Sequence, residues 1–421
     1  MTRPRPRLRA TAAAGGLLFS ALACVVPALA AVDKPAIEQA FKAWVAKNVW
    51  PEARAGGISR GTFDAAFAGV SLDWSLPELT PPGAPPAPQV EHQAELRSPG
   101  AYFKEDRLDS LARSGRTLLA EWAGPLAAIE KRYGVSRTIL VAVWAKESGF
   151  GAAALPYNAI AALATEAFLG ERKDLFRGEL IAALKILQAG DIAPARMRSS
   201  WAGALGQPQF LPSQFLKTAI DFDGDGKRDI WNSVPDSLAS MANYLDQQGW
   251  KPSRGWGVEA RVPADLPCTL EGPEQGKPMA EWAKLGVTRA DGSPLPNATK
   301  DRTGFLLMPA GRFGPAFIVS ENFYVLKAYN TSDLYALYVG HLADRFADNA
   351  AFAGQWGTVG GFTREAVKRM QDRLVAAGYD VGNADGLIGF KTRIAVGLWQ
   401  ARSGKPVTCF PDADAIKSEV R

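Results

Sequence analysis

One carboxylate lies within an otherwise apolar helical pattern and could act as an acid. The segment SRTILVAVWAKESGFG covers residues 136–151, and its spacing places Glu147 on the same helix face as Trp144. Apolar surroundings disfavour the charged form of a carboxyl group, so its pKa rises and it can hold a proton to donate. Glu147 therefore fits the general acid of glycosidic bond cleavage. The alternative is a glutamate at a helix end that reaches solvent or pairs with Lys146 or Arg137.

A string of aspartates could bind a hard cation. DFDGDGKRDIWNSVPD covers residues 221–236, and its first half matches the calcium loop of an EF-hand, in which oxygens converge on the ion. Asn232 replaces the usual glutamate at position 12, so we expect Asp236 to close a longer loop. The predicted ligands are Asp221, Asp223, Asp225, Lys227 through its backbone carbonyl, and Asp236. A calcium sensor typically has paired loops and a methionine-rich groove that it exposes. This sequence has one such loop and only six methionines, so we do not expect a sensor. The alternative is a solvated acidic turn.

The scarcity of histidine and cysteine excludes several other chemistries. His92 and His341 are the only histidines, and neither lies in a motif typical of a serine triad or a zinc site. Cys268 and Cys409 are far apart in the chain and lie near no histidine, so a cysteine nucleophile is not expected. They could form one disulfide, but the sequence leaves their pairing open. Acid and base chemistry is therefore expected to depend on carboxylates.

The first thirty residues have the order of segments typical of a secretory signal. Four arginines precede an apolar run and small residues, with cleavage expected after Ala30. The apolar run is shorter than the roughly 20 residues of a spanning helix. We therefore expect a periplasmic protein; lipid attachment at Cys24 is a weaker alternative. Without residues 1–30 the chain keeps 44 basic and 43 acidic residues, so nucleic acid is not an expected partner.

Apolar spacing predicts the elements that would position these residues. Residues 37–48 and 106–134 carry apolar stripes of helical period, whereas Gly, Pro and short mixed runs at 250–315 indicate loops with a few strands. AGQWGTVGG at 353–361 is a flexible break by composition, so we place a domain boundary near residue 357. The prediction is a mainly α protein with a catalytic region at 31–356, a small mixed subdomain within it, and a compact unit at 357–421.

Four motifs occur in an order that resembles a known family. They are KESGFG at 146–151, SWAGALGQPQFLPSQF at 200–215, DFDGDGKRDIWNS at 221–233 and ENFYVLKAYN at 321–330. Together they resemble the membrane-bound lytic transglycosylase B family of murein-degrading enzymes over about residues 35–350. The resemblance implies a lysozyme-like helical core and a single EF-hand-like site. It also implies that Glu147 is the single catalytic acid.

The same resemblance implies a set of substrate-binding residues. They are Ser148, Ser200, Gln209, Tyr244, Tyr329 and Asn330. For the two tyrosines, a core aromatic with a satisfied hydroxyl is an equal alternative. The pair before Gln209 departs from some relatives, which we expect to matter little. A bound calcium ion would join the segments that carry Gln209 and Tyr244, as a structural brace.

The resemblance also implies a reaction that needs only one carboxylate. Glu147 would protonate the oxygen between N-acetylmuramic acid and N-acetylglucosamine, and the muramoyl N-acetyl group would assist at the anomeric carbon. The Glu147 carboxylate would then take the proton of the C6 hydroxyl, which closes a 1,6-anhydro ring. Three alternatives stay open: a hydrolytic muramidase, a catalytically silent scaffold that binds the wall, and a calcium-regulated interaction protein.

Residues 362–421 are similar to a small three-helix peptidoglycan-binding module. The similarity lies at Leu374, Gly378-Tyr379, Asp385-Gly386 and Thr392 through Trp399-Gln400. Such a module would hold the enzyme on its polymer and raise the local concentration of substrate. The expected partner is the peptidoglycan glycan strand, with wall-synthesis complexes left open. We expect a monomer and no organic cofactor.

Overall fold

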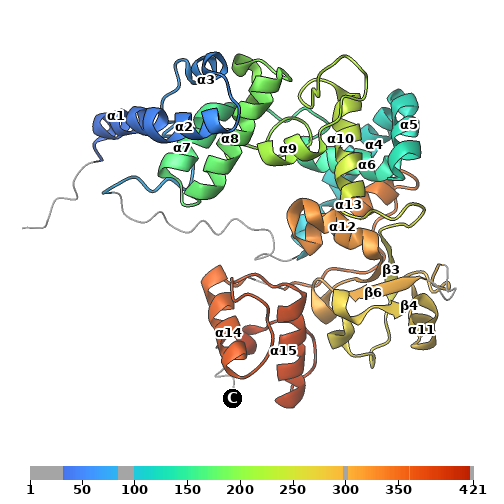
Figure 1. Ribbon diagram of the computed structural model, residues 1–421. Helices are drawn as coiled ribbons and strands as arrows, with labels where there is room; N and C mark the ends of the chain where they lie inside the picture. Colours follow the sequence, from blue (N-terminus) through green and yellow to red (C-terminus); the bar gives the residue numbers. More distant parts are fainter. Residues whose placement is uncertain (1–31, 84–98, 297–301, 360, 418–421) are drawn as a thin grey trace, which may run out of the picture.

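The computed structural model describes residues 32–83, 99–296, 302–359 and 361–417 and is mainly helical, as predicted (Figure 1). The predicted signal at 1–30 and Cys24 lie outside the described residues. No helix in the described ranges has both the length and the apolar character needed to cross a membrane.

A lobe of helices at one end of the molecule contains the first part of the chain (Figure 1). It consists of α1 (Lys34–Trp44), the π-helix η1 (Val45–Val49), α2 (Trp50–Ala55), α3 (Arg60–Phe67), α7 (Ala159–Leu169) and α8 (Lys173–Ala189). The predicted stripe of α1 is confirmed, because Phe41 is buried and Ile37 and Trp44 pack against the core. This lobe shares one hydrophobic cluster with the next group of helices.

The second group of helices surrounds α6 (Arg137–Ser148). Its other members are α4 (Glu105–Glu121), α5 (Ala123–Tyr133), α9 (Pro212–Thr218), α10 (Val234–Gln247), α12 (Glu321–Asn330) and α13 (Asp333–Arg345). Eight of the twelve residues of α6 are buried, because its apolar side chains occur on all sides. The Ser136 side chain caps its first turn, and Gly149 ends it with φ +56°. A buried helix of this kind gives Glu147, one residue before its end, a fixed backbone position.

Two small sheets complete the region before the C-terminal module. The first pairs β1 (Tyr157–Asn158) with β2 (Arg198–Ser199). The second has the order β4-β6-β7-β3-β5, with antiparallel neighbours throughout. Its strands are β3 (Gly257–Arg261), β4 (Lys277–Pro278), β5 (Thr288–Arg289), β6 (Thr303–Leu307) and β7 (Ala316–Val319), and α11 (Met279–Lys284) packs beside them. The mixed subdomain predicted at 250–315 is this sheet.

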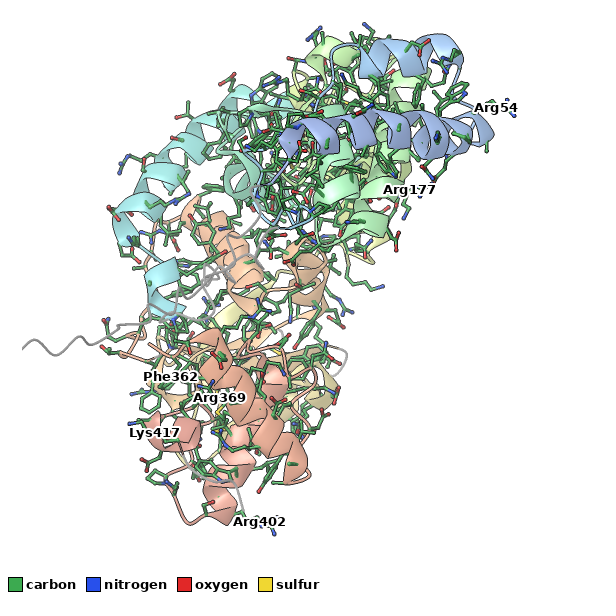
Figure 2. The ribbon with its side chains drawn as sticks, turned by 90° about the vertical axis from the view of Figure 1, so that its left-hand side faces the viewer. Arg54, Arg177, Phe362, Arg369, Arg402 and Lys417 are labelled. Atoms are coloured by element: carbon green, nitrogen blue, oxygen red, sulfur yellow. A yellow bond between two sulfur atoms is a disulfide. The ribbon has the colours of Figure 1, made fainter. Side chains whose placement is uncertain are left out.

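The C-terminal module has three helices, as predicted. They are α14 (Arg364–Ala376), α15 (Phe390–Arg402) and α16 (Ala413–Lys417), and they enclose their own hydrophobic cluster. Figure 2 shows the module, marked by Arg402, at the opposite end from the helical lobe marked by Arg54. Cys409 of the module forms a disulfide with Cys268, which follows the sheet strand β3. The boundary near residue 357 stays a prediction.

Candidate active site

Glu147 is half-buried at the end of α6 and contacts a second helix. The Tyr335 hydroxyl of α13 donates a hydrogen bond to Glu147 Oε1. Burial raises the pKa of Glu147 to about 7, although this hydrogen bond and the charge of Lys146 act in the opposite direction. Arg137 pairs with Glu130, so it is not the partner of Glu147. The carboxyl group can therefore exchange a proton near neutral pH, as the helical pattern predicts.

Three tyrosine rings form a row that ends at this carboxyl group. The rings of Tyr335 and Tyr329 are stacked with centroids 6.3 Å apart, and Tyr329 meets Tyr244 edge to face at 4.7 Å. The Tyr244 hydroxyl donates to the Ala328 carbonyl oxygen at 2.7 Å. Tyr244 thus has the satisfied hydroxyl of a core aromatic. The Tyr329 hydroxyl is buried and has no hydrogen-bond partner among the described residues, which is unusual for a buried polar group.

The loop before α9 presents two glutamines with different surroundings. Gln209 adopts φ +56°, and its side-chain nitrogen donates to the Gly206 carbonyl oxygen at 2.7 Å. Gln207 is buried and accepts a hydrogen bond from Trp144 Nε1 of α6 at 2.7 Å. It also donates to the Trp231 carbonyl oxygen at 3.2 Å. Gln207 therefore ties the helix of Glu147 to the acidic loop, a contact that the sequence did not predict.

The remaining predicted residues lie in three different environments. Ser148 is buried, and its hydroxyl accepts a hydrogen bond from the Gly151 amide at 3.0 Å, within the end of α6. The Ser200 hydroxyl accepts from the Ala204 amide at 3.1 Å and holds a turn. Asn330 is exposed at the end of α12. The substrate contacts of these residues stay predictions.

Tyr335 contacts Glu147 but is not among the residues that the motifs single out. Its side chain is 1% exposed, and it occurs in an ordinary helical pattern five residues after Asn330. The only sequence signal for Tyr335 is that it is the next tyrosine after the one in the KAYN motif. Its contact with Glu147 depends on how α13 packs on α6, which a local pattern does not contain.

A cavity of about 690 Å³ lies beside this site, between the helices and the C-terminal module. Tyr102 and Asn330 line it from one side, and Asn383 and Phe390 line it from the module. Tyr102 also belongs to the surroundings of the acid, because Lys146 Nζ lies 4.5 Å from the centre of its ring. The module therefore forms one wall of this cavity, whose lining reaches Asn330 but does not include Glu147.

The acidic loop brings three of its four predicted carboxylate ligands together. Carboxylate oxygens of Asp221, Asp223 and Asp236 lie within 4.8 Å of one another. Asp225 is outside this group and accepts a hydrogen bond from the Lys227 amide at 2.8 Å. Three like charges this close repel one another, and a cation with oxygen ligands would relieve the repulsion. The donor set therefore fits a calcium ion.

Asp236 connects the two ends of this loop. It is fully buried in the first turn of α10, where burial raises the pKa of its carboxyl group. Its Oδ1 accepts from the Phe222 amide at 2.8 Å, and its Oδ2 accepts from the Asp229 amide at 2.9 Å. Asn232, at the position of the usual closing glutamate, donates instead to the Asp229 carboxylate. Asp236 thus lies where a carboxylate could close the loop around a bound ion.

Family models match nearly the whole described chain. The model of the Transglycosylase SLT domain matches residues 40–344, and a model of a peptidoglycan binding domain matches residues 363–417. The membrane-bound lytic murein transglycosylase B of Escherichia coli (strain K12) is 31% identical over 216 residues. This match covers 51% of the chain and 58% of that relative.

Solved structures show the same fold. The chain is similar to SltB3 from Pseudomonas aeruginosa, solved in complex with NAG-NAM-pentapeptide, with 40% identity and a TM-score of 0.78. That match covers 90% of this chain and 98% of SltB3. Slt35 of Escherichia coli, solved in complex with calcium, is 24% identical with a TM-score of 0.56, covering 75% and 93% of the two chains. The similarity to Slt35 supports the fold alone.

Proposed function

The chain belongs to the Transglycosylase SLT domain family, and on this basis we propose that it is a lytic murein transglycosylase. It would cleave the β-1,4 bond between N-acetylmuramic acid and N-acetylglucosamine in peptidoglycan. The observation that carries this proposal is Glu147, a half-buried carboxyl group with a pKa near 7 at the end of a rigid helix. The likeness to SltB3, solved with a peptidoglycan fragment, supports the substrate class.

The surroundings of Glu147 favour a reaction with one carboxylate. Its pKa is set by burial, Tyr335 and Lys146, and no second carboxylate of the described residues contributes. Hydrolases that invert or retain configuration place two carboxyl groups across the bond. A single group with a pKa near neutral pH can serve first as acid and then as base.

The proposed reaction balances without added water. Protonated Glu147 gives its proton to the glycosidic oxygen, and the bond from that oxygen to the anomeric carbon breaks. The muramoyl N-acetyl oxygen assists at that carbon, and the Glu147 carboxylate then removes the C6 hydroxyl proton. The C6 oxygen bonds to the anomeric carbon, which yields a 1,6-anhydro end. Tyr335 would hold Glu147 in place through both steps, and the free Tyr329 hydroxyl would contact the sugar.

The other predicted residues take supporting parts in this proposal. Gln209 and Asn330 would contact the glycan, and Ser200 would hold a wall of the cleft. Ser148 would secure the end of α6, because its hydroxyl is already bonded there. We propose that calcium, when bound by Asp221, Asp223 and Asp236, braces the loop against α10. Periplasmic location, the monomeric state and partners in wall synthesis stay predictions.

The substitution Glu147→Gln tests the proposal. This variant keeps the shape of the side chain but cannot donate the proton. The rate at which soluble muropeptides are released from purified sacculi should therefore fall about 100-fold or more. Binding of the variant to sacculi in a pull-down should be unchanged. Release at the wild-type rate would exclude Glu147 as the catalytic acid.

A further inference from the structure

One arginine of the C-terminal module is inserted into the catalytic region. Arg393 of α15 has a side chain that is 2% exposed. Its Nε lies 2.5 Å from Glu271 Oε1, and its Nη2 lies 2.9 Å from Asp333 Oδ2. Its Nη1 donates to the Ile388 carbonyl oxygen at 3.1 Å, within the module. A single side chain thus joins the module to both the sheet subdomain and the helical core.

Asp333 lies at a turn that carries residues of the active site. It is the first residue of α13, and its Oδ1 accepts from Lys327 Nζ of α12 at 2.6 Å. Between these helices the chain reverses at Thr331, which has φ +34°. Asn330 precedes the reversal, and Tyr335 follows Asp333 by two residues. The pair of cations on Asp333 therefore fixes the turn between Asn330 and Tyr335.

The buried position makes this arrangement specific. A planar guanidinium can bind two carboxylates at a fixed angle, which an ammonium group cannot do. Removal of one member of a buried charge cluster leaves the others uncompensated, which destabilises the folded protein. The cluster thus has one favoured geometry. The position of α15 therefore determines, through Arg393 and Asp333, the position of the first turn of α13.

Other contacts hold the module where Arg393 can reach this turn. The disulfide joins Cys409 to Cys268, and the Arg312 amide donates to the Thr408 carbonyl oxygen at 2.9 Å. A side chain at Gly397 of α15 would meet Cys409 Sγ at 2.4 Å, so the helix and the disulfide pack closely. The module is docked by covalent and close contacts, beside the sheet in Figure 1.

We propose that Arg393 is a positioning residue for the reaction. Through Asp333 it fixes the α12–α13 turn, and through that turn it sets the place of Asn330 and the Tyr335 hydroxyl relative to Glu147. The inference rests on the proposed function. It gives the module a role in the geometry of the active site in addition to holding the polymer.

Two variants of nearly unchanged shape test this role in the full chain. Asp333→Asn removes the charge on the turn, whereas Glu271→Gln removes the charge on the opposite side of the same arginine. Both weaken the cluster and both should lower the melting temperature. Only Asp333→Asn should disturb the turn, so it alone should lower kcat, by up to about a hundredfold for a displacement near 1 Å.

The pH profile separates positioning from simple loss of stability. The titratable groups around Glu147 are Lys146 on its own helix, Tyr335 on α13 and Tyr329 on α12. The Tyr335 hydrogen bond lowers the pKa of Glu147, so its loss raises that pKa. Because the reaction needs protonated Glu147, the falling limb of kcat/KM should move to higher pH in Asp333→Asn and stay in place in Glu271→Gln.

The experiment separates failure of the Arg393 inference from failure of the proposed function. Wild-type protein must first release anhydro-muropeptides from sacculi; an inactive wild type would contradict the proposed function itself. With an active wild type, equal kcat and equal pH profiles in the two variants would overturn the role of Arg393. A shifted falling limb in Asp333→Asn that Arg393→Met reproduces would support it. A shift in Asp333→Asn without one in Arg393→Met would assign the turn to the Lys327–Asp333 pair and overturn it.

Discussion

The carboxyl group of Glu147 is held by residues from two helices that are far apart in sequence. α6 supplies the backbone position and the burial, and α13 supplies the hydroxyl of Tyr335. The two effects on the pKa of Glu147 are opposed: burial raises it, and the hydrogen bond lowers it. The balance leaves a group that is partly protonated at neutral pH, as an acid that later acts as a base requires.

Replacement of Tyr335 by phenylalanine tests this balance. Tyr335→Phe removes the hydrogen bond that favours the charged form, so the pKa of Glu147 should rise further. Because activity is lost as pH rises through this pKa, the falling limb of kcat/KM should move to higher pH. Maximal kcat should fall, since the carboxyl group loses its fixed orientation. Tyr338→Phe, on the same helix, is the control, and an identical shift there would contradict the assignment.

Residues of the site differ in how well the sequence predicts them. The burial of Glu147 could be predicted, because it follows from a local helical pattern. Tyr335 was not found, because its contact requires the packing of α13 on α6. Arg393 also gave no signal, since an arginine in a helix usually faces solvent.

Among the structural elements, the acidic loop is shaped by hydrogen bonds of its own. Each aspartate at its tip also accepts a backbone hydrogen bond, which gives the loop its shape before any ion binds. Asp236 then joins both ends of the loop to α10. The sequence predicted that closing position from the next available carboxylate, whereas the place of Asp225 outside the cluster depends on backbone turns that spacing does not specify.

Calcium should stabilise the protein through this loop. At free calcium of 100 times Kd, binding to the native state alone contributes about 2.7 kcal/mol. Removal of calcium with a chelator should therefore lower the melting temperature of wild type but not of Asp223→Ala. Asp291→Ala, which removes an exposed aspartate that accepts from Ser293, is the matched control and should keep the response to chelator. A wild-type melting temperature indifferent to chelator would exclude the calcium brace.

At the scale of the whole molecule, the module and the catalytic region form one connected structure. Two cysteines separated by 141 residues are paired, and a buried ion cluster lies at the same junction. The helices of the module could be predicted from local patterns, and its similarity to a wall-binding module is confirmed by the family match. Its docking could not be predicted, because that depends on contacts between distant segments.

Loss of the disulfide should weaken this connection. Replacement of Cys268 and Cys409 by serine should lower the free energy of unfolding by about 2–4 kcal/mol. The measurement is thermal unfolding with and without reductant. Reductant should lower the melting temperature of wild type and have no effect on the double variant. If reductant that fully reduces the wild type leaves its melting temperature unchanged, the disulfide does not support the docked arrangement.

The products of the reaction test the central claim most directly. Purified sacculi digested with the wild-type protein should yield muropeptides whose muramic ends are 1,6-anhydro rings, because in the proposed reaction Glu147 alone supplies both proton transfers. Mass spectrometry should find these products lighter by one water molecule than those of a hydrolytic muramidase. Products with reducing muramic ends and the added water would contradict a lytic transglycosylase.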